Sequence, residues 1–263
     1  MKRLIFLFSV TVLSLNWGCK GNHQGISKKD KTDVKPVVTQ IINNDNTLTS
    51  SEISDGWKLL FDGKSPAGWM NAKTKNFPAT GWEIKNGVLL TNPATKLPDG
   101  GGDIVTTGKF RNFELSVDFM YKQGANSGIK YFVNTEINNG DFASIGCEYQ
   151  ILDDRNNPDA KEGIAGNRKL AGLYDLIAPK NIKDNGADQW NTALIMVNGS
   201  KVQHWLNGLL TVEYERATPE WRELVAKSKF KQIPGFGEAD EGRVLLQDHG
   251  DTVSFKNIKI REF

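Results

Sequence analysis

The chain has 263 residues, of which 38% are hydrophobic and 24% are charged, a composition typical of a globular protein. Its formal net charge of +2 comes from 33 Lys and Arg against 31 Asp and Glu. Removal of residues 1–18 would take away Lys2 and Arg3 and leave 31 basic and 31 acidic side chains. Such a balance gives no electrostatic basis for binding nucleic acid or an anionic membrane surface, so we expect neither as a partner.

The N-terminus has the features of a secretion signal. Lys2 and Arg3 precede an almost wholly apolar segment, residues 4–15, which is shorter than the roughly 20 residues that span a bilayer. Cys19 follows as in bacterial lipoprotein signals, although Leu15 lies one position further from it than in the usual pattern. We expect lipidation at Cys19 and an exported lipoprotein at the periplasm or cell surface, anchored to the membrane only by its lipid. A plain signal peptide with an incidental cysteine is the alternative.

A lipidated chain would keep Cys147 as its one remaining thiol, because the sequence holds two cysteines. Without a partner for a disulfide, Cys147 is expected to be buried and unreactive. Residues 19–52 are rich in Lys, Asp, Asn, Ser and Thr with little apolar periodicity, which predicts a flexible tether. We therefore expect one folded domain over residues 53–263.

Apolar and polar residues alternate through this domain with the period of a half-buried β-strand, most clearly over residues 113–121. Asn198-Gly199 and Asn207-Gly208 predict tight hairpin turns. Residues 124–128 are typical of a turn, and a slip of parity predicts a β-bulge near Lys256 and Asn257. Further strands are expected at residues 129–133, 190–197, 201–205, 244–246 and 253–260.

One helix is expected, over residues 219–227. Thr218 can cap its N-terminus, Pro219 suits the first helical position, and Glu220 complements the positive end of the helix dipole. Many short strands with a single peripheral helix predict an all-β sandwich of two sheets rather than a parallel α/β fold.

Residues 147–154 carry several chemically active side chains within a predicted strand. Alternation places Glu148 and Gln150 on one face, with Cys147, Tyr149 and Ile151 on the other. If the apolar face points into the sandwich, Glu148 lies on the opposite, concave surface. A carboxylate there could act as a general base or accept sugar hydroxyls. A solvated outer face is the alternative.

Two of the three histidines lie in the domain. Gln247 and His249 share one face of a segment that is too polar for a core strand, which favours a role for His249 in a site. His204 has two open interpretations, a ligand contact or a hydrogen bond inside the hairpin. Tyr174 lies in a structured loop, where it could stack on a sugar ring or serve only in packing.

Several kinds of site are excluded by missing motifs. The sequence has no Gly-rich phosphate loop, no His-Glu-x-x-His and no paired Cys-x-x-Cys. No cofactor is therefore predicted. A divalent metal bound by Glu148, Asp248 and His249 is left open, although strand parity directs Asp248 away from His249.

The motifs of the domain, taken together, resemble the 3-keto-disaccharide hydrolase family, also described as 3-keto-glucoside lyase/hydratase domains. Each motif is short, so the specificity of the resemblance comes from their order. In chain order they are Trp57-Lys58-Leu59-Leu60-Phe61-Asp62-Gly63, Asn126-Ser127-Gly128-Ile129, Glu148-Tyr149-Gln150-Ile151-Leu152-Asp153, Leu173-Tyr174-Asp175, His204-Trp205-Leu206-Asn207-Gly208, Ser228-Lys229-Phe230, Leu246-Gln247-Asp248-His249-Gly250 and Phe255-Lys256-Asn257-Ile258-Lys259-Ile260.

This resemblance implies a concanavalin A-like jelly-roll sandwich of two antiparallel sheets, and substrates in which C3 of a glucoside is a ketone. The ketone acidifies the C2 proton, so a base can remove it while the aglycone leaves C1, and water then adds to give 3-keto-glucose. Such a site needs a base, an acid and a stabiliser of the enolate oxygen. Glu148 and His249 are the titratable pair that the resemblance implies. The residues expected to contact the sugar or the enolate are Asn126, Gln150, Asp153, Tyr174, Lys180, His204 and Gln247.

Two alternatives stay open. A conventional glycoside hydrolase of the same fold would use two carboxylates, but Gln150 occupies the next position on the face of Glu148. Asp153 or Asp248 could supply the second acid if strand parity breaks. A non-catalytic carbohydrate-binding module would show aromatic side chains in its cleft and would tolerate loss of Glu148 and His249.

Overall fold

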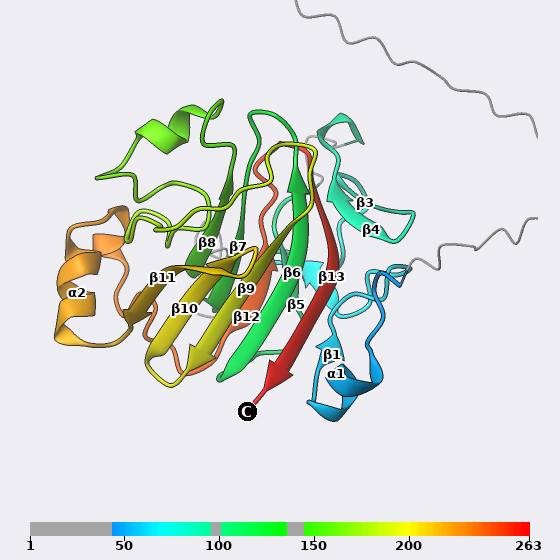
Figure 1. The fold of residues 1–263 in the computed structure, drawn as a ribbon, viewed down its shortest axis with the longest axis horizontal. Helices are drawn as coiled ribbons and strands as arrows, with labels where there is room; N and C mark the ends of the chain where they lie inside the picture. Colours follow the sequence, from blue (N-terminus) through cyan, green and yellow to red (C-terminus); the bar gives the residue numbers. More distant parts are fainter. Residues whose placement is uncertain (1–43, 96–100, 136–144) are drawn as a thin grey trace, which may run out of the picture. The chain divides into compact units, whose positions relative to one another are not determined.

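The computed structural model describes residues 44–95, 101–135 and 145–263, which form two antiparallel β-sheets (Figure 1). Within these residues the larger sheet has eight strands, seven of them in the order β11-β10-β9-β6-β13-β4-β3, with β1 paired to β13. The smaller sheet has five, in the order β2-β5-β12-β7-β8. Strands distant in the sequence are neighbours in both sheets, as in a jelly roll. The predicted all-β sandwich is confirmed.

The bounds of the elements follow the chain. The larger sheet comprises β1 (Lys58–Leu59), β3 (Trp82–Lys85), β4 (Val88–Thr91), β6 (Phe113–Tyr121), β9 (Asn191–Asn198), β10 (Lys201–Leu206), β11 (Leu209–Glu215) and β13 (Val253–Glu262). The smaller sheet comprises β2 (Trp69–Asn71), β5 (Ile104–Thr106), β7 (Asn126–Val133), β8 (Cys147–Leu152) and β12 (Arg243–Leu246). The helices of the described residues are α1 (Ser50–Ser54), α2 (Pro219–Ala226) and the 3₁₀ turns η1 (Pro93–Thr95), η2 (Pro158–Lys161) and η3 (Lys229–Gln232).

The core lies between the two sheets and follows from the period of two. Every second residue of β6 is buried, from Phe113 to Tyr121, and the intervening residues are half-buried. In contrast, all the residues of β7 and β8 are buried. Alternation therefore identifies the inner face of the smaller sheet. At β7 and β8 the outer face is buried as well, because other segments of the chain cover it. Cys147 is fully buried on the inner side, and burial raises the pKa of its thiol to about 12.

The bulge and the turn at Asn207-Gly208 are confirmed, and the first hairpin turn lies one residue later than predicted, because Asn198 still pairs with Lys201. β9 and β10 pair across Gly199 and Ser200, and Asn207 and Gly208 between β10 and β11 both have positive φ, as a type I′ turn requires. The register of β13 against β6 shifts between Lys256 and Lys259, which is the predicted bulge. One boundary differs, because β7 begins at Asn126 within the segment predicted as a turn.

Helix α2 begins where its cap was predicted. The Thr218 hydroxyl accepts a hydrogen bond from the main-chain N–H of Trp221 at 3.1 Å, and Trp221 is the residue of α2 that is buried. Among the described residues, no helix is both long enough and apolar enough to cross a membrane. Residues 1–43 contain the predicted signal, Cys19 and most of the predicted tether, and they lie outside the described residues.

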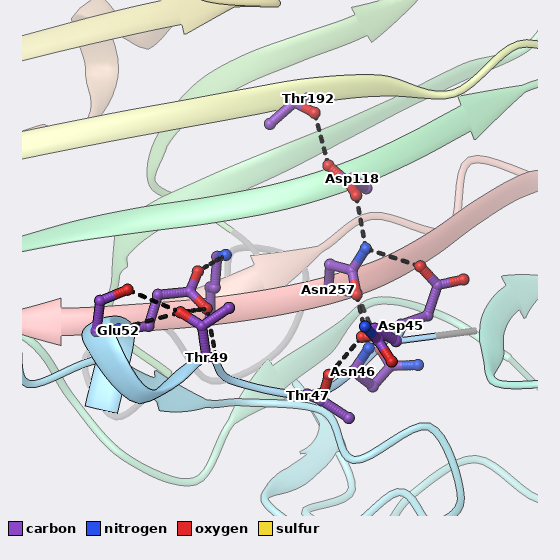
Figure 2. A network of polar contacts seen from close by, with 11 residues as sticks. Asp45, Asn46, Thr47, Thr49, Glu52, Asp118, Thr192 and Asn257 are labelled. Atoms are coloured by element: carbon purple, nitrogen blue, oxygen red, sulfur yellow. Dashed lines mark hydrogen bonds and ion pairs between the residues drawn. The ribbon is translucent and has the colours of Figure 1, made fainter. Parts of the chain in front are cut away.

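Residues 44–54, here called the N-terminal strap, are held on β13 by the polar network shown in Figure 2. At the bulge, Asn257 and Asn46 exchange two hydrogen bonds, from Asn46 N to Asn257 Oδ1 at 2.6 Å and from Asn257 N to Asn46 Oδ1 at 2.9 Å. The Asn257 side-chain amide also donates to Asp118 Oδ2 at 2.7 Å and to Asp45 Oδ1 at 3.2 Å. The strap is therefore bonded to β13, and Asn257 extends the same network to Asp118 of β6.

Helix α1 completes the strap and corrects the predicted extent of the tether. Thr49 and Glu52 form a capping box, and the Glu52 carboxylate pairs with Lys259 of β13. Residues 44–52 were predicted to belong to the flexible tether. The prediction was wrong for them because Asp45, Asn46 and Glu52 find specific partners on β13, which a composition-based argument does not detect.

Candidate active site

A polar pocket lies on the outer side of the smaller sheet, where β7, β8 and the chain after β12 run side by side. The loop after β8 and the start of η3 complete its wall. The lining residues are Asn126, Lys130, Ile145, Gly146, Glu148, Gln150, Tyr174, Lys229, Phe230, Gln247 and His249. Six of the residues predicted from the sequence thus meet in one place: Asn126, Glu148, Gln150, Tyr174, Gln247 and His249.

The loop after β8 covers the strand because it pairs with the free edge of β8. Gln150 N donates to Gly172 O at 3.2 Å, Ala171 N to Gln150 O at 2.8 Å, and Tyr174 N to Glu148 O at 3.0 Å. These bonds fix Tyr174 beside Glu148 and explain why both faces of β8 are buried. The pocket is consequently built on a rigid strand pair rather than on loops alone.

Glu148 is the one carboxylate among the described residues that line the pocket. It is 6% exposed, and its Oε2 lies 3.7 Å from the ammonium of Lys130 on the neighbouring strand. Burial raises the pKa of Glu148, while the charges of Lys130, Lys229 and His249 act in the opposite direction. A carboxyl group in this environment takes up and releases a proton closer to neutral pH than an exposed glutamate does.

Lys229 and Tyr174 also line the pocket and lie against each other. The Lys229 ammonium lies 3.9 Å from the centroid of the Tyr174 ring, and the main-chain N–H of Lys229 donates to Asp175 Oδ2 at 2.8 Å. Asp175 is itself held by Arg168, whose Nε donates to Asp175 Oδ1 at 2.7 Å. Burial lowers the pKa of Lys229, and the carboxylates of Glu148 and Asp175 oppose that shift.

Two amide oxygens in the pocket have no hydrogen-bond partner among the described residues. They are Oε1 of Gln150 and Oε1 of Gln247, and both are shielded from solvent. The Gln150 amide nitrogen donates to Asn126 Oδ1 at 3.4 Å, and Gln247 N donates to Gly128 O at 3.0 Å. Buried acceptors without donors are uncommon in native proteins. These two oxygens are therefore suited to accept hydrogen bonds from the hydroxyl groups of a ligand.

His249 and Asp248 diverge at the end of β12. His249 is exposed and lines the pocket. The Asp248 carboxylate accepts from Gly102 N at 2.7 Å and from Gly250 N at 3.1 Å, outside the pocket lining. The parity argument was therefore right about Asp248. Across the described residues, no cluster of three or more His, Cys, Asp or Glu is arranged to hold a metal ion.

Three residues predicted to contact the substrate lie elsewhere. His204 is fully buried in the core, where its Nε2 lies 2.8 Å from the Tyr131 hydroxyl, and burial lowers its pKa to about 3. Asp153 anchors a loop, since its carboxylate accepts from Gly124 N at 2.8 Å and from the Asn156 amide at 2.7 Å. Lys180 is exposed and is not a lining residue.

Two lysines of the pocket were missed as site residues. Lys130 lies between apolar residues of a strand, and strand parity places it on the same face as Gly128 and opposite Glu148, so alternation could have found it. Lys229 starts a 3₁₀ turn, where no periodic pattern applies. It occurs in one of the motifs that carry the family resemblance, but the sequence alone gives it no role.

A larger hollow of about 540 Å³ lies on the other sheet, over β9, β10 and β13. Its most buried ionic contact joins Arg261 to Glu114 at 2.7 Å, so these charges already neutralise each other. The pocket at Glu148 combines a buried carboxyl group, nearby ammonium groups and amide oxygens that lack a partner among the described residues, and we take it as the candidate active site for that reason.

A two-sheet jelly roll with such a pocket defines a β-sandwich protein of the concanavalin A-like class. The chain belongs to the family described as the 3-keto-alpha-glucoside-1,2-lyase-like domain, whose profile matches residues 56–261. It is 34% identical to a 3-keto-disaccharide hydrolase of Bacteroides thetaiotaomicron, over 92% of each chain. The family resemblance seen in the motifs is thereby confirmed.

Solved structures agree with the fold. A crystal structure of a candidate glycosyl hydrolase from Parabacteroides distasonis is similar with a TM-score of 0.73 and 30% identity, covering 83% of this chain and 99% of that one. A second candidate glycosyl hydrolase from the same organism has a TM-score of 0.56 and 25% identity, covering 79% and 99%.

Proposed function

We propose that this protein cleaves glycosidic bonds of 3-keto-glucosides, including 3-keto-disaccharides, by elimination followed by addition of water. The name of the Bacteroides relative supports a glycoside-cleaving hydrolase, and the family description supports the lyase step. The observation that carries the proposal is the single carboxylate, Glu148, among the described residues that line the pocket. Hydrolysis by the usual glycosidase route needs two carboxylates.

The elimination is chemically balanced without an external oxidant or reductant. A base removes the C2 proton, the C–H electron pair forms the C1–C2 double bond of the product, and the aglycone leaves C1 with its bonding pair and takes up a proton. Water then adds at C1, and a proton returns to C2. Glu148 and His249 both line the pocket and are assigned these transfers, because a carboxyl group and an imidazole can each give up and take up a proton, and burial raises the pKa of Glu148 above its ordinary value.

The unpaired amide oxygens support a sugar as the ligand. Gln150 Oε1 and Gln247 Oε1 can each accept a hydrogen bond from a hydroxyl group, which would remove the cost of leaving them unsatisfied. Asn126 orients the Gln150 amide. Tyr174 presents an aromatic ring beside these groups. An array of acceptors next to a ring matches a polyhydroxylated substrate better than an apolar one.

Side-by-side incubation with a glucoside and its 3-keto derivative tests the proposal. We expect turnover of the 3-keto compound alone, because without the ketone the C2 proton is too weakly acidic for a side-chain base. Equal turnover of the unoxidised glucoside would favour a conventional hydrolase. Binding without turnover of either compound, unaffected in Glu148→Gln and His249→Ala, would favour a carbohydrate-binding module.

We also propose that the protein is an exported lipoprotein attached through Cys19. The support is the sequence of residues 1–19, with its basic start, short apolar segment and cysteine. Fractionation of cells that express the full chain tests this. The Cys19→Ser variant is expected to leave the membrane fraction or to retain its uncleaved signal, and unchanged membrane partitioning would reject the anchor.

A further inference from the structure

The ammonium group of Lys229 is available to bind a ligand in the pocket, because no carboxylate of the described residues pairs with it. In the described part of the chain it has no ion-pair partner within 4.0 Å, and its close neighbours are the rings of Tyr174 at 3.9 Å and Phe230 at 5.2 Å. Lys130, the other lining lysine, is committed to the Glu148 carboxylate at 3.7 Å. The two lysines therefore differ in what they can contact.

The backbone of Lys229 is fixed independently of its side chain. Ser228 caps η3 by accepting from Phe230 N at 3.1 Å, and Asp175 Oδ2 accepts from Lys229 N at 2.8 Å. Arg168 holds Asp175 and Asp159 together through bonds of 2.7 and 2.9 Å. A cation on such a support is preorganised, so little reorganisation is needed when charge develops on a bound substrate.

Lys229 and Glu148 face the same space. Each shifts the pKa of the other, since the Lys229 charge lowers the pKa of Glu148 and the Glu148 charge raises the pKa of Lys229. A substrate in the pocket that both residues line would meet the Glu148 carboxyl group and the Lys229 ammonium together. This matches the needs of a C2–C3 unit in which a proton leaves C2 while negative charge develops on the C3 oxygen.

We infer that Lys229 binds the C3 carbonyl oxygen of the substrate and stabilises the enolate that forms there, while Lys130 serves as the counter-ion of Glu148. The inference rests on the proposed function. In this step the C2–H bond breaks, its electron pair forms a C2–C3 double bond, and the former carbonyl pair moves to oxygen. Lys229 donates a hydrogen bond to that oxygen and forms no covalent bond.

A substrate analogue without a leaving group isolates this step. In 1,5-anhydro-3-keto-glucitol no aglycone can depart from C1, so enolisation is separated from aglycone loss, and exchange of the C2 proton for deuterium is followed by NMR. We expect Lys229→Met to slow both exchange and 3-keto-glucoside cleavage by about 100-fold to 1,000-fold, the usual loss when a stabiliser of an oxyanion is removed. Lys229→Arg should recover part of the rate because it keeps the charge.

Lys231→Met is the matched control, because Lys231 is an exposed residue of the same 3₁₀ turn and does not line the pocket. Its exchange and cleavage rates should equal those of the wild type. Thermal unfolding of all three variants separates loss of chemistry from loss of fold, and Lys229→Gln replaces Lys229→Met if the latter does not fold.

Three results would overturn the inference. Near-wild-type exchange in a folded Lys229→Met or Lys229→Gln variant would remove Lys229 from the step while leaving the proposed function intact. A reduced covalent adduct at Lys229, after borohydride treatment with the 3-keto-glucoside, would replace the hydrogen bond by an imine. A folded wild-type protein with neither exchange nor cleavage would overturn the proposed function, and this inference with it.

Discussion

Gly128 of β7 lies directly beneath the carboxyl group of Glu148 on β8. A Cβ atom added at position 128 would lie 2.2 Å from Glu148 Oε1 and 2.9 Å from its Cγ and Cδ. Real Cβ atoms do not approach other heavy atoms so closely, so any side chain at position 128 would displace Glu148. The absence of a side chain at one residue thus sets the position of the proposed proton-transfer group on the next strand.

Gly128→Ala is therefore expected to reduce kcat on a 3-keto-glucoside by about 100-fold, the loss that accompanies a displacement of roughly 1 Å in a catalytic group. The control is Gly108→Ala, whose Cβ would meet only Phe110 at an ordinary 3.5 Å and should leave kcat unchanged. Steady-state kinetics of both variants, with thermal melts to check folding, measures the effect. A Gly128→Ala rate equal to that of the Gly108→Ala control would contradict this positioning role.

Glu148→Gln is expected to lower kcat by about 100-fold to 10,000-fold, the range for loss of a general acid or base, and to change stability with pH. Because burial raises the pKa of Glu148 above its ordinary 4.5, ionisation of the folded protein costs free energy. That cost is absent below about pH 4.5 and grows as pH rises through the folded pKa. The glutamine variant avoids it, so its stability relative to the wild type should increase from pH 4 to pH 8.

Urea unfolding of wild type and Glu148→Gln across this pH range measures the difference. Glu162→Gln is a suitable control for the substitution itself, because Glu162 is exposed and does not line the pocket. A relative stability of Glu148→Gln that falls as pH rises would mean that the Lys130 contact outweighs burial.

His204 gives a pH dependence of the opposite sign. Its pKa falls from 6.5 to about 3 in the folded protein, so protonation favours the unfolded state. Its stabilising contribution is fully present above pH 6.5 and is lost as pH falls toward 3. His204→Phe cannot be protonated. At pH 7 it should be less stable than the wild type by about 1–3 kcal/mol, since the Tyr131 hydroxyl loses a partner, and the deficit should shrink at pH 4.5.

The same variant checks the corrected place of His204. Because the side chain is buried in the core and does not line the pocket, a folded His204→Phe protein should retain the wild-type KM for the 3-keto-glucoside. A large rise in KM without loss of fold would return His204 to the substrate site. Denaturant titrations at the two pH values and initial-rate measurements provide both readouts.

The alternation of the strands predicted the faces of the sheets better than it predicted the site. It placed Glu148 and Gln150 opposite Cys147 and Tyr149, and the structure has them so. The same parity puts His204 with Val202 and Leu206 on the buried face of β10. A polar residue flanked at both same-face positions by apolar ones belongs to the core, and that argument from the sequence alone would have excluded it as a ligand contact.

What the sequence could not predict depends on contacts between distant segments. Lys229 enters the pocket because Asp175, more than fifty positions earlier, binds its main-chain N–H. The strap is ordered because Asn46 meets Asn257 across a separation of 211 positions. Neither contact leaves a periodic pattern, and the strap composition by itself resembles a linker. The family resemblance supplied the order of motifs, but not which of their polar residues face the pocket.

The Asn46–Asn257 contact leads to a prediction about the strap. Asn257 has φ 51, so Asn257→Gly keeps the backbone conformation and removes only the side-chain bonds to Asn46, Asp45 and Asp118. We expect this variant to lose about 1–3 kcal/mol of unfolding free energy, the cost of leaving such partners unsatisfied. Limited proteolysis should then cut within residues 44–57 faster than in the wild type.

Asn86→Gly is the control for the glycine itself. Asn86 also has a positive φ, 53, and lies exposed in the turn between β3 and β4, so its replacement should change stability little. Both variants should keep wild-type cleavage of the 3-keto-glucoside, because the strap is attached to the larger sheet and the pocket lies on the smaller one. If Asn257→Gly matched the Asn86→Gly control in unfolding free energy and in proteolysis of the strap, the network in Figure 2 would not be what holds residues 44–54 to β13. If instead it lost activity while folded, the network on the larger sheet, in which Asp118 accepts from both Asn257 and Thr192, would be coupled to the pocket on the smaller sheet.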